Sequence, residues 1–74
     1  MRDRIKRIMS IVFDIPELEI NDNISARYFS KWDSLKHMKL IMAIEEEFGI
    51  LFDDREIFQL TDLDTIVSSI NKHT

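Results

Sequence analysis

The chain has 74 residues, 45% of them hydrophobic, with a formal net charge of −4 and no cysteine. Its length allows a single domain over residues 1–74, and the missing cysteines exclude disulfides, a thiol nucleophile and cysteine-based metal sites. One glycine and two histidines leave no Gly-rich phosphate loop and no histidine-rich metal site. The acidic balance argues against nucleic acid, and no apolar run is long enough for a signal peptide or membrane insertion. We therefore expect a cytoplasmic, monomeric helical domain without a metal.

The N-terminal segment predicts an amphipathic helix over roughly residues 2–14. Its apolar residues recur at i, i+3, i+4 and i+7, namely Ile5, Ile8, Met9 and Val12. Pro16 lies just beyond, and a residue before proline is disfavoured in a helix. The stretch from Ile15 to Asp33 has turn chemistry at Asn21-Asp22-Asn23 and scattered apolar residues. We interpret this stretch as an ordered loop, pinned by its apolar residues and containing one short helical turn.

A second helix is predicted to begin at Asp33-Ser34-Leu35 and to run to about Phe48. Asp33 is a suitable N-cap, because its carboxylate can accept from the backbone N–H groups of the first turn. Gly49 suits the left-handed position that ends a helix. The helix is apolar almost all round, which indicates a central position or an apolar surface for a partner.

Two shorter helices are predicted after Gly49. The first spans about residues 54–59, and the second runs from a capping box at Thr61-Asp62-Leu63-Asp64 to about Asn71. No strand alternation or hairpin signal is present, so the fold class is all-α with four helices. The predicted core is Ile5, Ile8, Val12, Leu40, Ile44, Phe48, Leu63, Ile66 and Ile70.

The helix that opens with Asp33-Ser34-Leu35 and ends with Glu45-Glu46-Glu47-Phe48-Gly49 resembles the acyl carrier protein family. The order and spacing of the predicted elements match that family over nearly the whole chain. The resemblance implies a four-helix acyl-carrier-like bundle with a long loop between helices 1 and 2 and a short third helix. It also implies that Ser34 carries covalent 4′-phosphopantetheine derived from coenzyme A. Asp33 and Leu35 would then help the modifying enzyme to recognise the site.

The resemblance implies three kinds of partner: a phosphopantetheinyl transferase, an acyl- or aminoacyl-loading enzyme, and a condensing or transfer enzyme. The chain itself would catalyse nothing and would shuttle an acyl group, held as a thioester, between biosynthetic enzymes. The sequence offers no convincing base for Ser34, because His37 has no orienting acid, and the resemblance implies that Ser34 is the acceptor of a transferase reaction and not a catalytic nucleophile. The absence of cysteine is consistent with this, because the sulfur comes from the cofactor. Trp32 either covers the arm as a lid or, as we expect, anchors the loop.

The segment after the serine departs from the acidic pattern of fatty-acid carriers, because it contains Lys36 and Lys39. These lysines are either ordinary solvated residues or a sign of different partners, as in a specialised pathway. Met38 and Met42 continue the stripe that begins at Leu35, which is either core or a docking patch, and we favour the patch. We expect Lys36, Met38, Lys39 and Met42 to bind partners. Two alternatives stay open: an aminoacyl or D-alanyl carrier, and an unmodified helical protein-interaction module.

Overall fold

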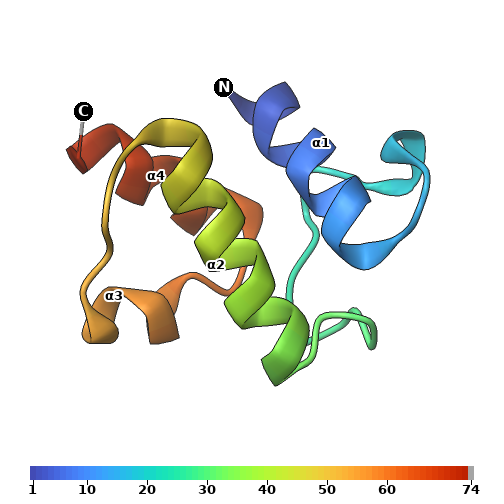
Figure 1. Ribbon diagram of the computed structural model, residues 1–74. Helices are drawn as coiled ribbons and strands as arrows, with labels where there is room; N and C mark the ends of the chain where they lie inside the picture. Colours follow the sequence, from blue (N-terminus) through green and yellow to red (C-terminus); the bar gives the residue numbers. More distant parts are fainter. Residues whose placement is uncertain (74) are drawn as a thin grey trace.

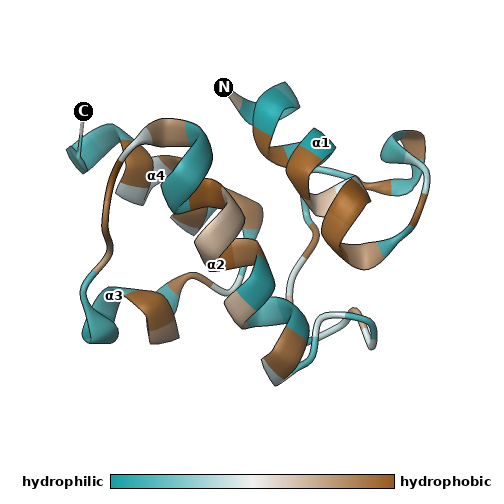
Figure 2. Cartoon of the chain, viewed as in Figure 1, coloured by the Kyte–Doolittle hydropathy of each residue, from teal (hydrophilic) through white to brown (hydrophobic). Residues whose placement is uncertain are grey.

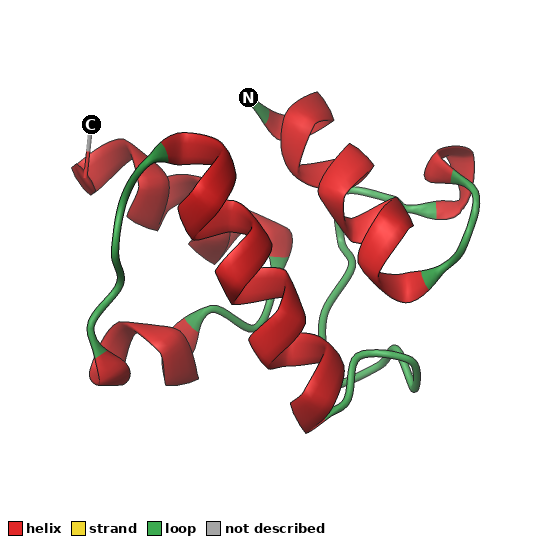
Figure 3. Ribbon diagram, viewed as in Figure 1, coloured by secondary structure: helices red, strands yellow, loops and turns green. Residues whose placement is uncertain are grey.

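The computed structural model describes residues 1–73, which form an all-α fold of four helices, as predicted (Figures 1 and 3). The elements in chain order are α1 (Arg2–Phe13), the 3₁₀ turn η1 (Glu17–Glu19), α2 (Ser34–Phe48), α3 (Asp54–Gln59) and α4 (Leu63–His73). The bounds of α1, α2 and α3 agree with the prediction to within a residue, and the expected helical turn in the long loop is η1. Along residues 1–73, no helix is both long and apolar enough to cross a membrane.

The core lies where α1, α2 and α4 meet. In α1, the spacing of the apolar residues explains which side chains enter it. Ile5, Met9 and Phe13 are spaced four residues apart and are all buried, because this spacing places them on one helix face. Each helix carries both hydrophobic and hydrophilic residues, as the colouring of Figure 2 shows. The buried hydrophobic residues are Ile5, Met9, Phe13, Ile20, Ile24, Trp32, Leu40, Ile41, Ile44, Phe52, Leu60, Leu63, Ile66 and Ile70.

Three residues of the predicted core are only partly buried: Ile8, Val12 and Phe48. Ile8 and Val12 lie on the flank of α1, because the buried face is centred on Met9. Phe48 is the last residue of α2, and the Arg4 guanidinium covers its ring at 4.4 Å from the centroid. All three side chains therefore pack against the core, as predicted, but none of them is fully buried.

The long loop between α1 and α2 is ordered by buried side chains, as predicted, and by backbone pairing. Ile20, Ile24 and Trp32 are buried, so Trp32 anchors the loop. The N–H of Ala26 donates to the carbonyl of Thr61 at 2.8 Å, beside an isolated β-bridge that joins residues 25 and 62. The loop is thus tied to the connection between α3 and α4.

The cap of α4 differs from the predicted capping box by one residue. The helix begins at Leu63, and the carboxylate of Asp62 accepts from the N–H of Thr65 at 2.7 Å. Asp62, and not Thr61, is therefore the capping residue. A full capping box occurs at α3, where Asp53 accepts from the N–H of Glu56 at 2.7 Å and the Glu56 carboxylate accepts from the N–H of Asp53 at 3.3 Å.

Candidate functional site

The site begins at the N-terminus of α2, which Asp33 caps as predicted. Its Oδ1 accepts from the N–H of Lys36 and its backbone carbonyl accepts from the N–H of His37, both at 2.8 Å. Ser34 is the first helical residue and is exposed. The N–H groups of Ser34 and Leu35 precede the first helical hydrogen bond, so they lie at the positive end of the helix dipole. An anionic group attached to the Ser34 hydroxyl would be stabilised by this environment.

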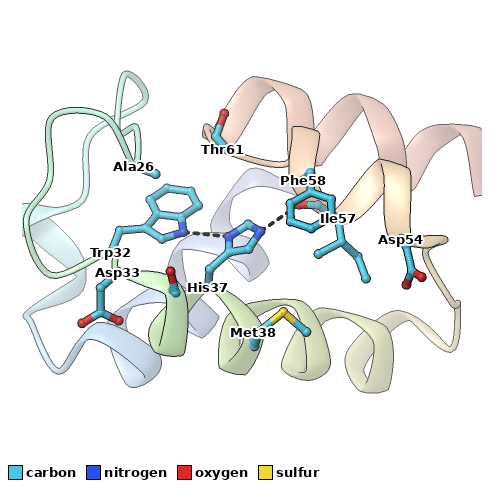
Figure 4. A pocket seen from close by; sticks show the side chains of 10 residues that line it. Ala26, Trp32, Asp33, His37, Met38, Asp54, Ile57, Phe58 and Thr61 are labelled. Atoms are coloured by element: carbon cyan, nitrogen blue, oxygen red, sulfur yellow. Dashed lines mark hydrogen bonds between the residues drawn. The ribbon is translucent and has the colours of Figure 1, made fainter.

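A groove of about 560 Å³ adjoins Ser34 and is formed by the loop before α2, the first turn of α2, and α3 (Figure 4). Its lining is mainly apolar, from Ala26, Trp32, Met38, Ile57 and Phe58, together with His37. Polar side chains of Asp33, Ser34, Asp54 and Thr61 complete it, and all four are exposed. This groove could not be predicted from the sequence, because residues of the loop and of α3 meet α2 there only in the folded chain.

Two hydrogen bonds through His37 connect the loop, α2 and α3 on one side of the groove. Trp32 Nε1–H donates to His37 Nδ1 at 3.0 Å, and His37 Nε2–H donates to the carbonyl of Ile57 at 2.8 Å (Figure 4). These partners require a neutral imidazole with its proton on Nε2. Since both ring nitrogens are engaged, His37 has no free nitrogen to act as a base toward Ser34.

His37 is unavailable as a base, as predicted, but it also has a packing role that was not anticipated. It precedes the buried Leu40, Ile41 and Ile44 by three, four and seven residues, so it lies on the inward face of α2. That spacing is visible in the sequence and could have identified His37 as an interior residue. Its partners could not be found in this way, because Ile57 is twenty residues away.

The outward face of α2 next to Ser34 is apolar with two positive charges. Leu35 and Met42 are 63% and 64% exposed, and Met38 is also exposed. Lys39 is exposed between them, whereas Lys36 is partly buried. The structure therefore gathers the predicted site residues on the first two and a half turns of α2. No carboxylate lies on α2 before Glu45, which accepts from the N–H of Phe52 at 2.9 Å.

The opposite side of the groove, α3, is tied to α4 by polar contacts. None of its residues, Asp54–Gln59, is buried, and Phe58 is 80% exposed. Glu56 accepts from the hydroxyl of Ser69 at 2.7 Å and pairs with His73 at 3.0 Å, both on α4. The Ser69 hydrogen bond, followed by that of His73, holds the pKa of Glu56 below its ordinary value.

Within residues 1–73, no three acidic or histidine side chains are grouped so that they could hold a metal ion. In comparison with known protein families, the chain matches a family described as "Phosphopantetheine attachment site". The match covers residues 3–70 and thus includes all four helices except the ends of α1 and α4, the capped serine and the groove.

Proposed function

Because the chain belongs to the phosphopantetheine attachment family and is a carrier of 4′-phosphopantetheine, we propose that Ser34 is the residue to which this group is attached. The observation that supports Ser34 is its position: an exposed hydroxyl on the first residue of a capped helix, beside an apolar groove. The residues present fit the group, since the Ser34 and Leu35 N–H groups and the helix dipole favour a phosphodiester there.

Attachment is a transfer from coenzyme A. The Ser34 oxygen forms a bond to the phosphorus that bears the pantetheine arm, the pyrophosphate bond breaks, and adenosine 3′,5′-bisphosphate leaves. The hydroxyl proton passes to a base of the phosphopantetheinyl transferase, because both nitrogens of His37 are already hydrogen-bonded. The thiol of the attached group then holds an acyl group as a thioester. We propose that the chain itself catalyses neither step.

We propose further that the protein carries acyl groups in a specialised biosynthetic pathway. Its partners would be the transferase, a loading enzyme, and a condensing or transfer enzyme that docks on Leu35, Met38 and Met42. The apolar lining of the groove favours an acyl group over an aminoacyl group, whose ammonium would lose hydration there. An aminoacyl or D-alanyl carrier remains the second candidate, because the exposed carboxylates of Asp33 and Asp54 lie at the groove.

The assignment to Ser34 is tested by incubating the protein with a promiscuous phosphopantetheinyl transferase and coenzyme A and then measuring intact mass. The parent chain should gain the mass of one phosphopantetheine group, and Ser34→Ala should gain none. Alanine is a good helical residue, so this variant should keep the fold and its circular dichroism spectrum. Modification of Ser34→Ala would show that another residue is the attachment site. An unmodified parent chain would favour the alternative that the protein is an unmodified protein-interaction module.

The specialised pathway is tested through Lys36 and Lys39. Their positive charges should repel condensing enzymes of fatty-acid synthesis whose docking surfaces are cationic. The acylated parent should therefore be a poor substrate for such an enzyme. The double variant Lys36→Asp with Lys39→Glu should be turned over faster, and more so at low salt, since exposed charges are screened. Equal turnover of parent and variant at low ionic strength would remove these lysines from partner choice.

A further inference from the structure

The groove beside Ser34 is separated from the helical core by a wall, which we define as Trp32, His37 and the Ile57 backbone. Trp32 is 5% exposed, and its ring packs against the ring of the core residue Phe13, with the two ring centroids 5.3 Å apart. On its other side, Trp32 meets the edge of the His37 ring through the hydrogen bond from Nε1–H to Nδ1, with ring centroids 6.2 Å apart. His37 in turn bonds to Ile57 across the gap between α2 and α3. The same residues line the groove, so the wall has one face toward the core and one toward the groove.

The wall offers no hydrogen-bonding group to a molecule in the groove. The indole N–H and both imidazole nitrogens are used within the wall. Throughout residues 1–73, every buried side-chain nitrogen and oxygen has a hydrogen-bond partner. The exposed polar groups, including Thr61 and Asp54, belong to side chains in contact with solvent. The interior of the groove therefore suits an uncharged, apolar group, because a polar one would lose hydration without replacement.

The wall also blocks the route from Ser34 to the core. An alkyl chain that entered the core between α2 and α3 would have to break the hydrogen bond from His37 to Ile57 and displace the Trp32 ring. Both losses are costly, because they leave buried polar groups unpaired and separate the packed Trp32 and Phe13 rings. The groove, by contrast, is open to solvent next to Ser34 and needs no rearrangement.

We propose that this wall keeps the carried group in the surface groove and out of the core, so that the cargo is a short, uncharged acyl group. His37 is the specificity-determining residue of the wall, because it alone bonds to both the loop and α3. The inference rests on the proposed attachment at Ser34. It goes further in naming the chemical class of the cargo and the residues that set its length.

The direct test is a chain-length series on the parent protein. Ser34 is loaded with hydrolysis-resistant amide analogues of acetyl-, octanoyl- and palmitoyl-phosphopantetheine, and methyl and indole resonances are recorded by NMR. Octanoyl loading should shift the resonances of the Trp32 indole N–H and the Met38 methyl, whereas the methyl resonances of Ile44 and Ile66 should be unchanged. The Tm should be the same for the acetyl and palmitoyl forms, since the extra chain stays in solvent.

Two results would overturn the inference. Shifts of the core methyls with chain length, together with a Tm that rises by several degrees, would show that the chain enters the core. Octanoyl loading without any shift at Trp32 or Met38 would show that the groove does not hold the chain. Neither result contradicts the proposed attachment of phosphopantetheine at Ser34. Failure to load Ser34 at all, judged by intact mass, would instead contradict the proposed function.

Substitution of His37 tests the wall itself. His37→Ala removes both hydrogen bonds, so octanoyl loading should now shift the Ile44 methyl and raise the Tm above that of the acetyl form. His73→Ala is the matched control, because His73 also bonds to α3, through Glu56, but does not line the groove. It should respond like the parent. If octanoyl-loaded His37→Ala also responds like the parent, the wall does not set cargo length. If His37→Ala does not fold, the series on the parent still decides.

Discussion

Substitution of Asp33 by alanine separates the two roles expected for this residue, capping α2 and recognition by the transferase. Asp33 is exposed, and its side chain contributes one hydrogen bond of 2.8 Å to the N–H of Lys36. Little buried surface is lost, so the cost should be that of an N-cap, about 1 kcal/mol. In a domain of this size, that corresponds to a decrease in Tm of about 4–8 °C. Urea unfolding followed by circular dichroism should show a lower midpoint with an unchanged m-value.

Asp53→Ala is the matched control, because Asp53 caps α3 with the same chemistry but does not line the groove. Both alanine variants should lose comparable stability, whereas only Asp33→Ala should slow transfer of phosphopantetheine to Ser34. Asp33→Asn should retain the cap, since asparagine caps helices as well as aspartate does. Slower transfer to Asp33→Asn would then isolate the role of the charge. An unchanged urea midpoint for Asp33→Ala would refute the capping argument, and equal slowing by both alanine variants would refute recognition.

The remaining predictions concern the core and the attachment of α3. Ile44→Ala should cost about 2–5 kcal/mol in urea unfolding, because the side chain is fully buried. Phe48→Ala should cost less than Ile44→Ala, since its ring is partly exposed, and the reverse order would show that Phe48 belongs to the core. Because the folded-state pKa of Glu56 is lowered, its stabilising effect is present above the ordinary glutamate pKa and is lost as the pH falls through the folded value. Ser69→Ala should raise that pKa and reduce the loss of stability between neutral pH and about pH 4. If the parent and Ser69→Ala lose the same stability over this range, the Ser69 hydrogen bond is not what lowers the pKa of Glu56.

The helices could be predicted because their signals are local. Gly49 ends α2 with a φ of 64°, in the left-handed conformation that its position predicted. The bounds of α3 follow from Asp53 and its neighbours, whose capping chemistry lies within four residues. The cap of α4 was misplaced because Thr61 and Asp62 are adjacent and both are capping residue types. Only the three-dimensional contact with Thr65 distinguishes them.

The exposed part of the site could also be predicted, for a physical reason. A helix has one inward face, and Leu40, Ile41 and Ile44 fill that of α2, so Leu35 and Met42 remain outside. The wall could not be predicted, because the contact that closes it joins His37 to Ile57, twenty residues away. The missing orienting acid correctly excluded His37 as a catalytic base, but it gave no sign that both ring nitrogens serve the packing of the loop and α3.

The measurement that tests the central claim most directly is peptide mapping of the protein after modification with coenzyme A. Trypsin cleaves after Lys31 and Lys36, which releases the peptide Trp-Asp-Ser-Leu-Lys, and Ser34 carries its only hydroxyl group. Tandem mass spectrometry should find phosphopantetheine on this peptide and on none of those that contain the other five serines. Phosphopantetheine on another peptide, with this one unmodified, would contradict the assignment of Ser34 as the attachment site.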